Sequence, residues 1–281
     1  MDLTARAVAA AAQETTGDDF RVVNREGAGG LVGHTYLAQQ AQPDGYELGV
    51  IAVDFLVFDV ALRDAEFSQE DFAPLAYIAF EPVVQVVRAD SELAGMTFEQ
   101  ITEQAAANPG DLRIGVVPNT TFDVFTSVVS EQTGAEFNAV PFDGGKPGVT
   151  ALLAGDLDIT NAFYGEVQAF IDSGDLVPIV ISDNTPYEAL PDVPTMAEAG
   201  LPGAENTSWG AVLVPAGTPA ETLARLSGLL RAALDQPDLR ERFAGQGFSA
   251  AWMQPDAFGR FLQAEIDKWS AVVKSSGATV D

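Results

Sequence analysis

The chain has 281 residues, of which 41 are acidic and 14 are basic, so its formal net charge is −27. A surface with this excess of negative charge repels nucleic acid and anionic lipid, because binding there needs lysine and arginine to neutralise phosphates. The sequence has no cysteine, which excludes disulfides, thiolate metal sites and cysteine nucleophiles. The length suffices for one large or two medium domains, and no run of roughly 18 apolar residues predicts a membrane-spanning helix.

Strand-like and helix-like segments alternate along the first part of the chain. Asp2 can cap a first helix, and a short apolar run at residues 20–23 predicts a strand that leads into a glycine-rich turn. A continuous apolar run at 47–53 predicts a buried strand, after which Asp54 marks the start of a helix. The other elements expected here are a helix up to about residue 40, a strand at 77–88 and a helix at 97–107 that begins with the capping box Thr97-x-x-Gln100.

The turn Asn108-Pro109-Gly110 marks a boundary, after which strands and helices alternate strictly. This run of βα units predicts a parallel sheet with right-handed crossovers, so the fold class is α/β. A further strand at 209–214 precedes two amphipathic helices, and each of these helices must cover a sheet. The expected strands lie at residues 112–117, 137–142, 157–162 and 177–181, and the expected helices at 120–132, 147–154 and 165–173.

Motifs for catalysis or cofactor binding are incomplete in this sequence. His34 is the only histidine, and no Gly-x-Ser-x-Gly sequence places a serine on a nucleophile elbow. Gly27-Ala28-Gly29 begins a dinucleotide fingerprint, but Val32 stands where the third glycine is needed. Gly144-Gly145-Lys146-Pro147 lacks the Walker spacing, and Asp156-x-Asp158-x-Thr160 lacks the glycine and glutamate of a calcium loop. We therefore expect a protein without catalysis, cofactor or bound metal.

An ordered series of short motifs covers the whole chain nearly without gaps. The motifs lie at Val23 to Gly33, Pro43 to Tyr46, Asp71 to Pro74, Pro191 to Pro202, Pro215 to Pro219 and Lys268 to Ala278. Each motif is weak alone, but in this order they resemble the solute-binding proteins of the tripartite tricarboxylate transporters, the Bug family.

The resemblance implies a two-domain, periplasmic-binding-protein-like fold of type II with a hinged cleft. Domain one would comprise residues 1–108 and 213–281, and domain two would comprise residues 109–212. The implied protein is a periplasmic monomer that performs no chemistry and needs no cofactor. It would capture a small organic acid by closing its two domains, and would deliver that ligand to the subunits of a membrane transporter.

Helix starts that face a cleft can hold a carboxylate without lysine or arginine, through unpaired backbone amides and the helix macrodipole. The family resemblance implies ligand contacts at such starts. Matched residue by residue, these contacts fall on Ala52, Val53, Asp54 and Phe55 in domain one, and on Asn119, Thr120, Thr121, Phe122, Asp123, Ala162, Phe163 and Tyr164 in domain two.

Two acids depart from the family pattern, which commonly has small or amide residues at the position of Asp54 and often histidine at that of Asp123. These side chains either cap helices, Asp123 through Thr120-x-x-Asp123, or face the ligand and repel a dianion. An aromatic cluster lies near these acids in the sequence. Its residues either pack in the core or contact the ligand, and in the second case they favour an aromatic or amine-bearing acid as the ligand. The cluster comprises Phe55, Phe58, Phe122, Phe163 and Tyr164.

Two other functions stay open at this point: a ligand sensor for a two-component system, and an enzyme that works in the same cleft. The beginning of the chain gives one further expectation. Members of the family normally have a first strand and a Pro-Gly-Gly loop before the residues that match Asp2 to Arg6. We therefore expect that Met1 is a truncated or misassigned start, with a signal peptide, the strand and the loop encoded upstream.

Overall fold

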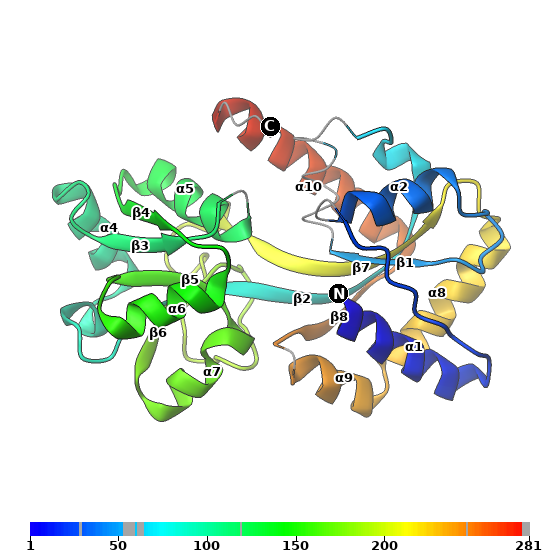
Figure 1. Ribbon diagram of the computed structural model, residues 1–281, viewed down its shortest axis with the longest axis horizontal. Coiled ribbons are helices and arrows are strands. Elements are labelled where there is room, and N and C mark those ends of the chain that lie inside the picture. Colours follow the sequence, from blue (N-terminus) through cyan, green and yellow to red (C-terminus); the bar gives the residue numbers. More distant parts are fainter. Residues whose placement is uncertain (28–29, 53–59, 61–64, 119, 246, 277–281) are drawn as a thin grey trace. The chain divides into compact units, whose positions relative to one another are not determined.

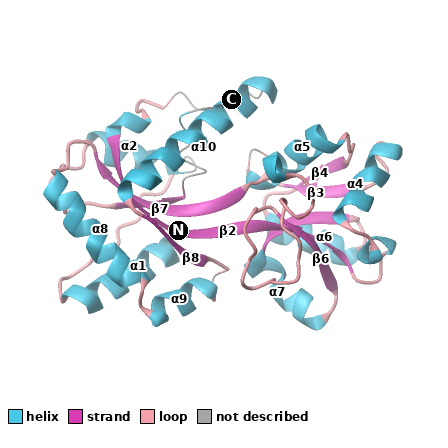
Figure 2. Ribbon diagram, turned by 180° about the vertical axis from the view of Figure 1, so that it is seen from behind, coloured by secondary structure: helices cyan, strands magenta, loops and turns pink. Residues whose placement is uncertain are grey.

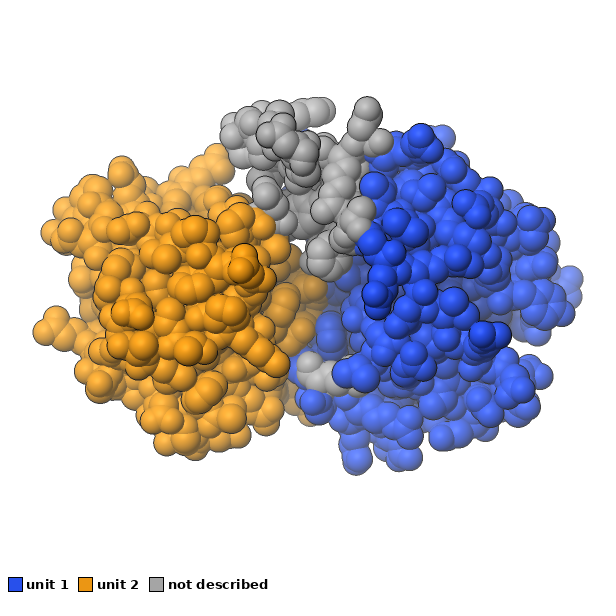
Figure 3. Space-filling view, viewed as in Figure 1, with its two compact units in different colours: residues 1–80, 209–281 blue, residues 81–208 orange. Residues whose placement is uncertain are grey.

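The computed structural model describes residues 1–281 apart from 28–29, 53–59, 61–64, 119, 246 and 277–281. The chain divides into two compact units: residues 1–80 with 209–281 form unit 1, and residues 81–208 form unit 2 (Figure 3). Strands β2 (Phe72–Arg88) and β7 (Thr207–Pro215) each contribute residues to both units. Unit 1 is therefore built from both ends of the chain.

The boundaries of these units differ from the domains expected from the sequence. Residues 81–108 lie in unit 2 and residues 209–212 lie in unit 1. The difference arises because β2 is one continuous strand: its earlier residues pair with β8 (Ser249–Met253) in unit 1, and its later residues pair with strands of unit 2. The turn at Asn108-Pro109-Gly110 thus lies inside unit 2.

Unit 1 is a sheet covered by helices on both faces (Figures 1 and 2). Strand β1 (Gly49–Ala52) pairs antiparallel with β7, and β8 pairs antiparallel with β2. The buried apolar faces of α1, α8 and α9 pack against this sheet and form its core. The helices of unit 1 are α1 (Asp2–Thr16), α2 (Leu31–Gln39), α8 (Ala220–Leu234), α9 (Pro237–Ala244) and α10 (Pro255–Ser276).

Aromatic side chains attach α10 to the sheet of unit 1. The ring of Tyr77 stacks on Trp209 with centroids 5.5 Å apart, and Phe258 and Phe261 of α10 meet Trp209 edge-on at 5.7 and 5.0 Å. Such pairs stabilise a fold beyond the area that they bury. The amphipathic pattern of the last helix is therefore explained by its buried face.

One element expected in unit 1 does not form. Residues 20–23 were expected to be a strand, but the backbone there is irregular. A strand needs a hydrogen-bonded neighbour, and none of the described strands pairs with this segment. Conversely, α9 and β8 were not expected, because α9 spans only eight residues and β8 lies between a polar segment and the last helix.

Unit 2 contains a mixed sheet with α4 and α5 on one face and α6 and α7 on the other (Figures 1 and 2). Strand β3 pairs in parallel with β4 and β5, as the βα pattern predicted, whereas β2 runs antiparallel to β5 and β6. Its strands are β3 (Arg113–Val116), β4 (Asn138–Pro141), β5 (Ile159–Phe163) and β6 (Leu176–Ile181), and its helices are α4 (Phe98–Ala107), α5 (Thr121–Thr133), α6 (Gly145–Ala154) and α7 (Tyr164–Ser173). Short 3₁₀ helices lie at Gln69–Asp71 in unit 1, and at Glu92–Gly95 and Pro202–Ala204 in unit 2.

Helix α4 shows how closely a sequence pattern can determine a local structure. The Thr97 hydroxyl accepts from the Gln100 amide at 3.3 Å, and the Gln100 side chain accepts from the Thr97 amide at 2.9 Å. This is the capping box expected from the sequence. Phe98 and Ile101 then point into the unit 2 core, where they join Phe125 and Val129 of α5.

Candidate functional site

Three helices of unit 2 begin at the same edge of its sheet. Helices α5, α6 and α7 follow strands β3, β4 and β5, and these strands are parallel, so their carboxyl ends lie together. A helix start presents unpaired amides and the positive end of the macrodipole. This edge of unit 2 is the candidate site that the structure describes.

The start of α5 contains four of the expected ligand contacts, Thr120, Thr121, Phe122 and Asp123. Thr120 is the N-cap residue: its hydroxyl donates to the Val117 carbonyl at 2.7 Å and accepts from the Phe122 amide at 3.3 Å. Asp123 lies in the first turn, where a negative charge is favourable. The cap of this helix is therefore a neutral hydroxyl.

A network of buried amide side chains forms hydrogen bonds with the first turn of α5. Asn161 of β5 donates to the Phe122 carbonyl at 3.1 Å and to the Thr126 hydroxyl at 2.8 Å, while Gln85 of β2 donates to Asn161 at 3.3 Å. Asn206 donates to the Thr121 carbonyl at 2.6 Å. Asn161, Gln85 and Asn206 are each at most 2% exposed. Because buried amides are costly to leave unpaired, this network holds the turn in one position.

This network was not predicted from the sequence, although two of its members have a recognisable signal. Gln85 and Asn161 are the amide side chains of their strands, and most of the residues around them are apolar. A lone polar residue in a buried strand needs a partner, which indicates a buried contact even before the structure is known.

The start of α7 contains the other expected contacts of unit 2. Phe163 and Phe122 contact each other with ring centroids 4.7 Å apart, so the structure brings the starts of α5 and α7 together. Tyr164 packs edge-on against Tyr187 at 5.6 Å, and Ala162 is fully buried. Of the expected aromatic cluster, Phe122 belongs to the unit 2 core with Phe163 partly buried against it.

The remaining expected contacts belong to unit 1 or are not described. Ala52 is a buried residue at the end of β1, paired with Gly210 of β7. Val53, Asp54, Phe55 and Asn119 lie outside the described residues, as does Phe58 of the expected aromatic cluster. The other residue considered in the sequence, His34, is a buried side chain of α2 whose ring meets Phe67 edge-on at 6.3 Å.

Two glutamates lie at the starts of α6 and α7. Glu166 accepts from the Phe163 amide at 3.1 Å, and a Cβ atom at Gly145 of α6 would overlap its carboxylate. Glu81 of β2 is 5% exposed and accepts from the Gly165 amide of α7. Burial raises the pKa of Glu81 to about 8, and the nearby charge of Glu166 raises it further against the lowering effect of the Gly165 amide. Glu81 is also a polar residue within an apolar run, but its partner Gly165 lies 84 residues later and could not be identified from the sequence.

Among the described residues, no helix combines the length and apolar character needed to cross a lipid bilayer. Nor does the described part of the chain bring together three or more His, Asp or Glu side chains that could hold a metal ion.

Two α/β units, one of them built from both ends of the chain, are the architecture of the two-domain solute-binding proteins. Residues 4–278 match the model of the tripartite tricarboxylate transporter family receptor, TctC. The chain therefore belongs to this family. The protein BugT from Bordetella pertussis is 31% identical over 283 aligned positions, which cover 99% of this chain and 85% of BugT. The resemblance seen in the sequence motifs is thereby confirmed.

Solved structures agree with this assignment. A TctC solute-binding protein from Polaromonas superposes with a TM-score of 0.87 at 26% identity, covering 98% of this chain and 93% of that protein. A Rhodopseudomonas palustris protein with adipate superposes at 0.77 and 27% identity, with 99% and 94% of the two chains covered. MatC from the same organism, with bound malate, superposes at 0.72 and 27% identity, with 97% and 94% covered. The two-domain α/β fold expected from the sequence is confirmed.

Proposed function

We propose that the protein is an extracytoplasmic solute-binding receptor. In the periplasm it captures a small organic acid between its two domains by hinge closure. It then delivers this ligand to a tripartite transporter in the membrane. The protein acts as a monomer, without cofactor, and performs no chemistry on the ligand. Strands β2 and β7, which contribute to both units, are the hinge in this proposal.

The observation that carries the proposal is the fixed start of α5. A neutral hydroxyl caps this helix, and buried amides hold its first turn, so its backbone amides are preorganised before a ligand arrives. Preorganised amides bind a carboxylate at little cost in conformational entropy. We propose that the ligand contacts are Thr120, Thr121, Phe122, Asp123, Ala162, Phe163 and Tyr164, together with Asn119 and the loop at Ala52, Val53, Asp54 and Phe55.

The related structures support an organic acid as the ligand. MatC was solved with bound malate and its R. palustris relative with adipate, and both ligands are carboxylic acids. Both proteins are similar to this chain over more than nine-tenths of their lengths. We propose that this chain binds the same chemical class.

Binding should not require a divalent ion, because the described residues provide amides and hydroxyls at the candidate site and no metal-ligand cluster. Calorimetric titration of a panel of small carboxylic acids should give saturable one-to-one binding with the same affinity in the presence and absence of EDTA. If every acid binds only after calcium, magnesium or zinc is added, the metal-free proposal is wrong.

A further inference from the structure

A single buried hydroxyl joins the two strands that contribute to both units. Ser182 follows β6 and is fully buried within unit 2. Its hydroxyl accepts from the Val83 amide of β2 at 2.8 Å and donates to the carbonyl of Asn206, the residue before β7. Backbone hydrogen bonds repeat both links: the Ser182 amide donates to the Val83 carbonyl at 2.9 Å, and the Asn206 amide donates to the Ser182 carbonyl at 2.7 Å. Both strands are thus bonded to one residue where they enter unit 2.

These contacts lie beside the boundary of unit 2. The unit spans residues 81–208, so Val83 is its third residue and Asn206 is the third from its end. At the next position, the Thr207 hydroxyl donates to the buried Asp183 carboxylate at 2.8 Å. Because buried polar groups are costly to leave unpaired, these bonds fix the entering ends of β2 and β7 to the end of β6. Bending of the two strands is therefore left to the residues nearer unit 1.

Asn206 extends this connection to the candidate site. Its side-chain amide donates to the carbonyl of Thr121, the first residue of α5, at 2.6 Å, while its backbone amide and carbonyl are both bonded to Ser182. Asn206 is 2% exposed, so water does not replace these bonds. The path from the end of β6 to the first turn of α5 thus passes through one residue.

We propose that Ser182 and Asn206 are positioning residues that couple closure of the two domains to ligand binding at α5. They make the start of α5 move together with the entering ends of β2 and β7, so that a bound acid and the bending strands act on the same element. A ligand can shift the open and closed states only by binding them differently, and this connection makes the position of α5 differ between them. The inference rests on the proposed function, and neither residue is among the ligand contacts proposed there.

Two variants remove the side-chain parts of the connection. Ser182→Ala deletes the shared hydroxyl but keeps the backbone bonds, and Asn206→Ala deletes the donor to Thr121. Titration of the carboxylic-acid panel, beginning with malate and adipate, should show about tenfold weaker binding for each variant, since each loses buried hydrogen bonds of the closed state. The double variant should also bind about tenfold more weakly than the wild type, and not a hundredfold, because both changes break the same path.

Closure itself can be measured with two spin labels, because the sequence has no cysteine of its own. Ala106→Cys on α4 and Ala224→Cys on α8 place one label at an exposed helix position of each unit. In this background, a saturating acid should narrow the distribution of label distances to one closed population. With Ser182→Ala or Asn206→Ala added, the distribution should stay broad at a saturating concentration of the same acid. A purely structural role would change the affinity but not the saturated distribution.

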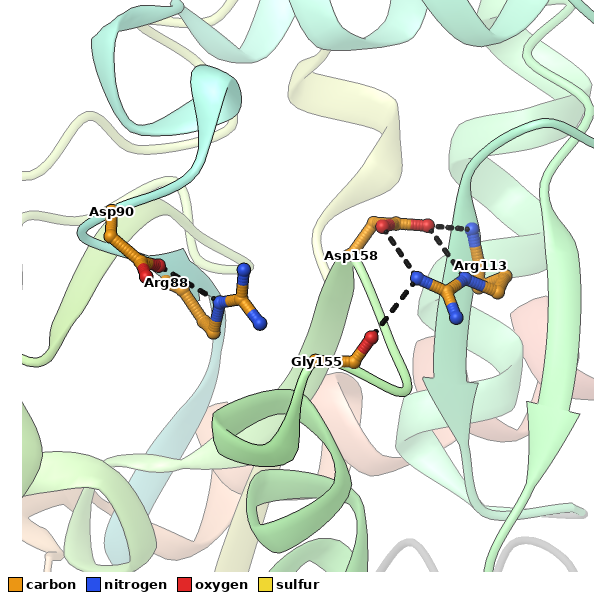
Figure 4. A network of polar contacts seen from close by, with 5 residues as sticks. All are labelled: Arg88, Asp90, Arg113, Gly155 and Asp158. Atoms are coloured by element: carbon orange, nitrogen blue, oxygen red, sulfur yellow. Dashed lines mark hydrogen bonds and ion pairs between the residues drawn. The ribbon is translucent and has the colours of Figure 1, made fainter.

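The ion pair of Arg113 and Asp158 provides a matched control within unit 2. The Arg113 guanidinium contacts the Asp158 carboxylate at 2.9 and 3.0 Å and donates to the Gly155 carbonyl at 3.2 Å (Figure 4). Arg113 begins β3 and Asp158 precedes β5, so the pair lies at the opposite ends of these strands from the starts of α5 and α7. Asp158→Asn should therefore leave the affinity and the saturated distance distribution unchanged.

The outcomes separate this inference from the proposed function. If no acid of the panel binds to the folded wild-type protein, the proposed function fails and this inference fails with it. If acids bind, but Ser182→Ala and Asn206→Ala match Asp158→Asn in affinity or in the saturated distance distribution, the inference is wrong and the proposed function stands. A hundredfold loss in the double variant would also reject it, since the two residues would then act independently. Either single variant decides the question if the other does not fold.

Discussion

Replacing Glu81 by glutamine should remove most of a pH-dependent loss of folding stability between about pH 5 and pH 8. The side chain is 5% exposed, and burial holds its pKa near 8, well above the ordinary value of 4.5. The folded protein therefore keeps a proton that the unfolded chain releases over this range, so stability is fully present below pH 4.5 and is lost as the pH rises toward 8. At about 1.4 kcal/mol per pH unit, the loss reaches up to about 4 kcal/mol.

Urea unfolding at pH 5, 6.5 and 8 measures this effect. The free energy of unfolding of Glu81→Gln should exceed that of the wild type by an amount that grows with pH, because the amide is neutral throughout. Glu198→Gln is the control, because Glu198 is an exposed glutamate of unit 2 that also accepts from a backbone amide, that of Thr195 at 2.9 Å. If the free energies of unfolding of the wild type and Glu81→Gln instead change in parallel with pH, Glu81 is ionised in the folded protein.

Phe122→Ala should destabilise the protein by about 3–5 kcal/mol, which is typical of truncating a buried phenylalanine. Phe122 is 5% exposed, belongs to the unit 2 core, and its ring lies 4.7 Å from that of Phe163. The change removes this ring contact and leaves a cavity under the first turn of α5. Phe122→Leu should recover more than half of the loss, because leucine refills most of the space.

The comparison with Phe125→Ala separates packing from ligand contact. Phe125 lies on the same helix and is fully buried in the same core, so its truncation should cost a similar amount in urea unfolding. If Phe122→Ala unfolds at the wild-type urea concentration but loses its affinity for acids, then Phe122 is a ligand contact and not a core residue.

Most helices and strands could be predicted from the sequence, because their signals are local. The capping box at Thr97 and Gln100 and the apolar runs of β2 and β5 each determine a structure through neighbouring residues. The expected strand at 20–23 failed because strand formation depends on a partner elsewhere in the chain. The unit boundary within β2 was missed for a similar reason, since an apolar run does not reveal which strands it will pair with.

Only those parts of the candidate site that lie within a single segment of the chain could be predicted from the sequence. The starts of α5 and α7 follow from their strands and turns, so Thr120 and Phe163 could be placed at helix starts from sequence. The contacts that shape the site join distant segments: Asn206 reaches Thr121 across 85 positions, and Glu81 meets the amide of Gly165. No periodicity or spacing in a single sequence encodes such pairs.

The central claim, that this receptor binds a small organic acid, is tested most directly by ligand capture. The protein is unfolded, washed free of bound compounds and refolded, and is then mixed with equal amounts of small organic acids, amino acids, sugars and nucleosides. Gel filtration removes unbound compounds, and mass spectrometry identifies those released on denaturation. We predict that every retained compound carries a carboxylate. Retention of a sugar or nucleoside, or of none of the acids by the refolded protein, would contradict it.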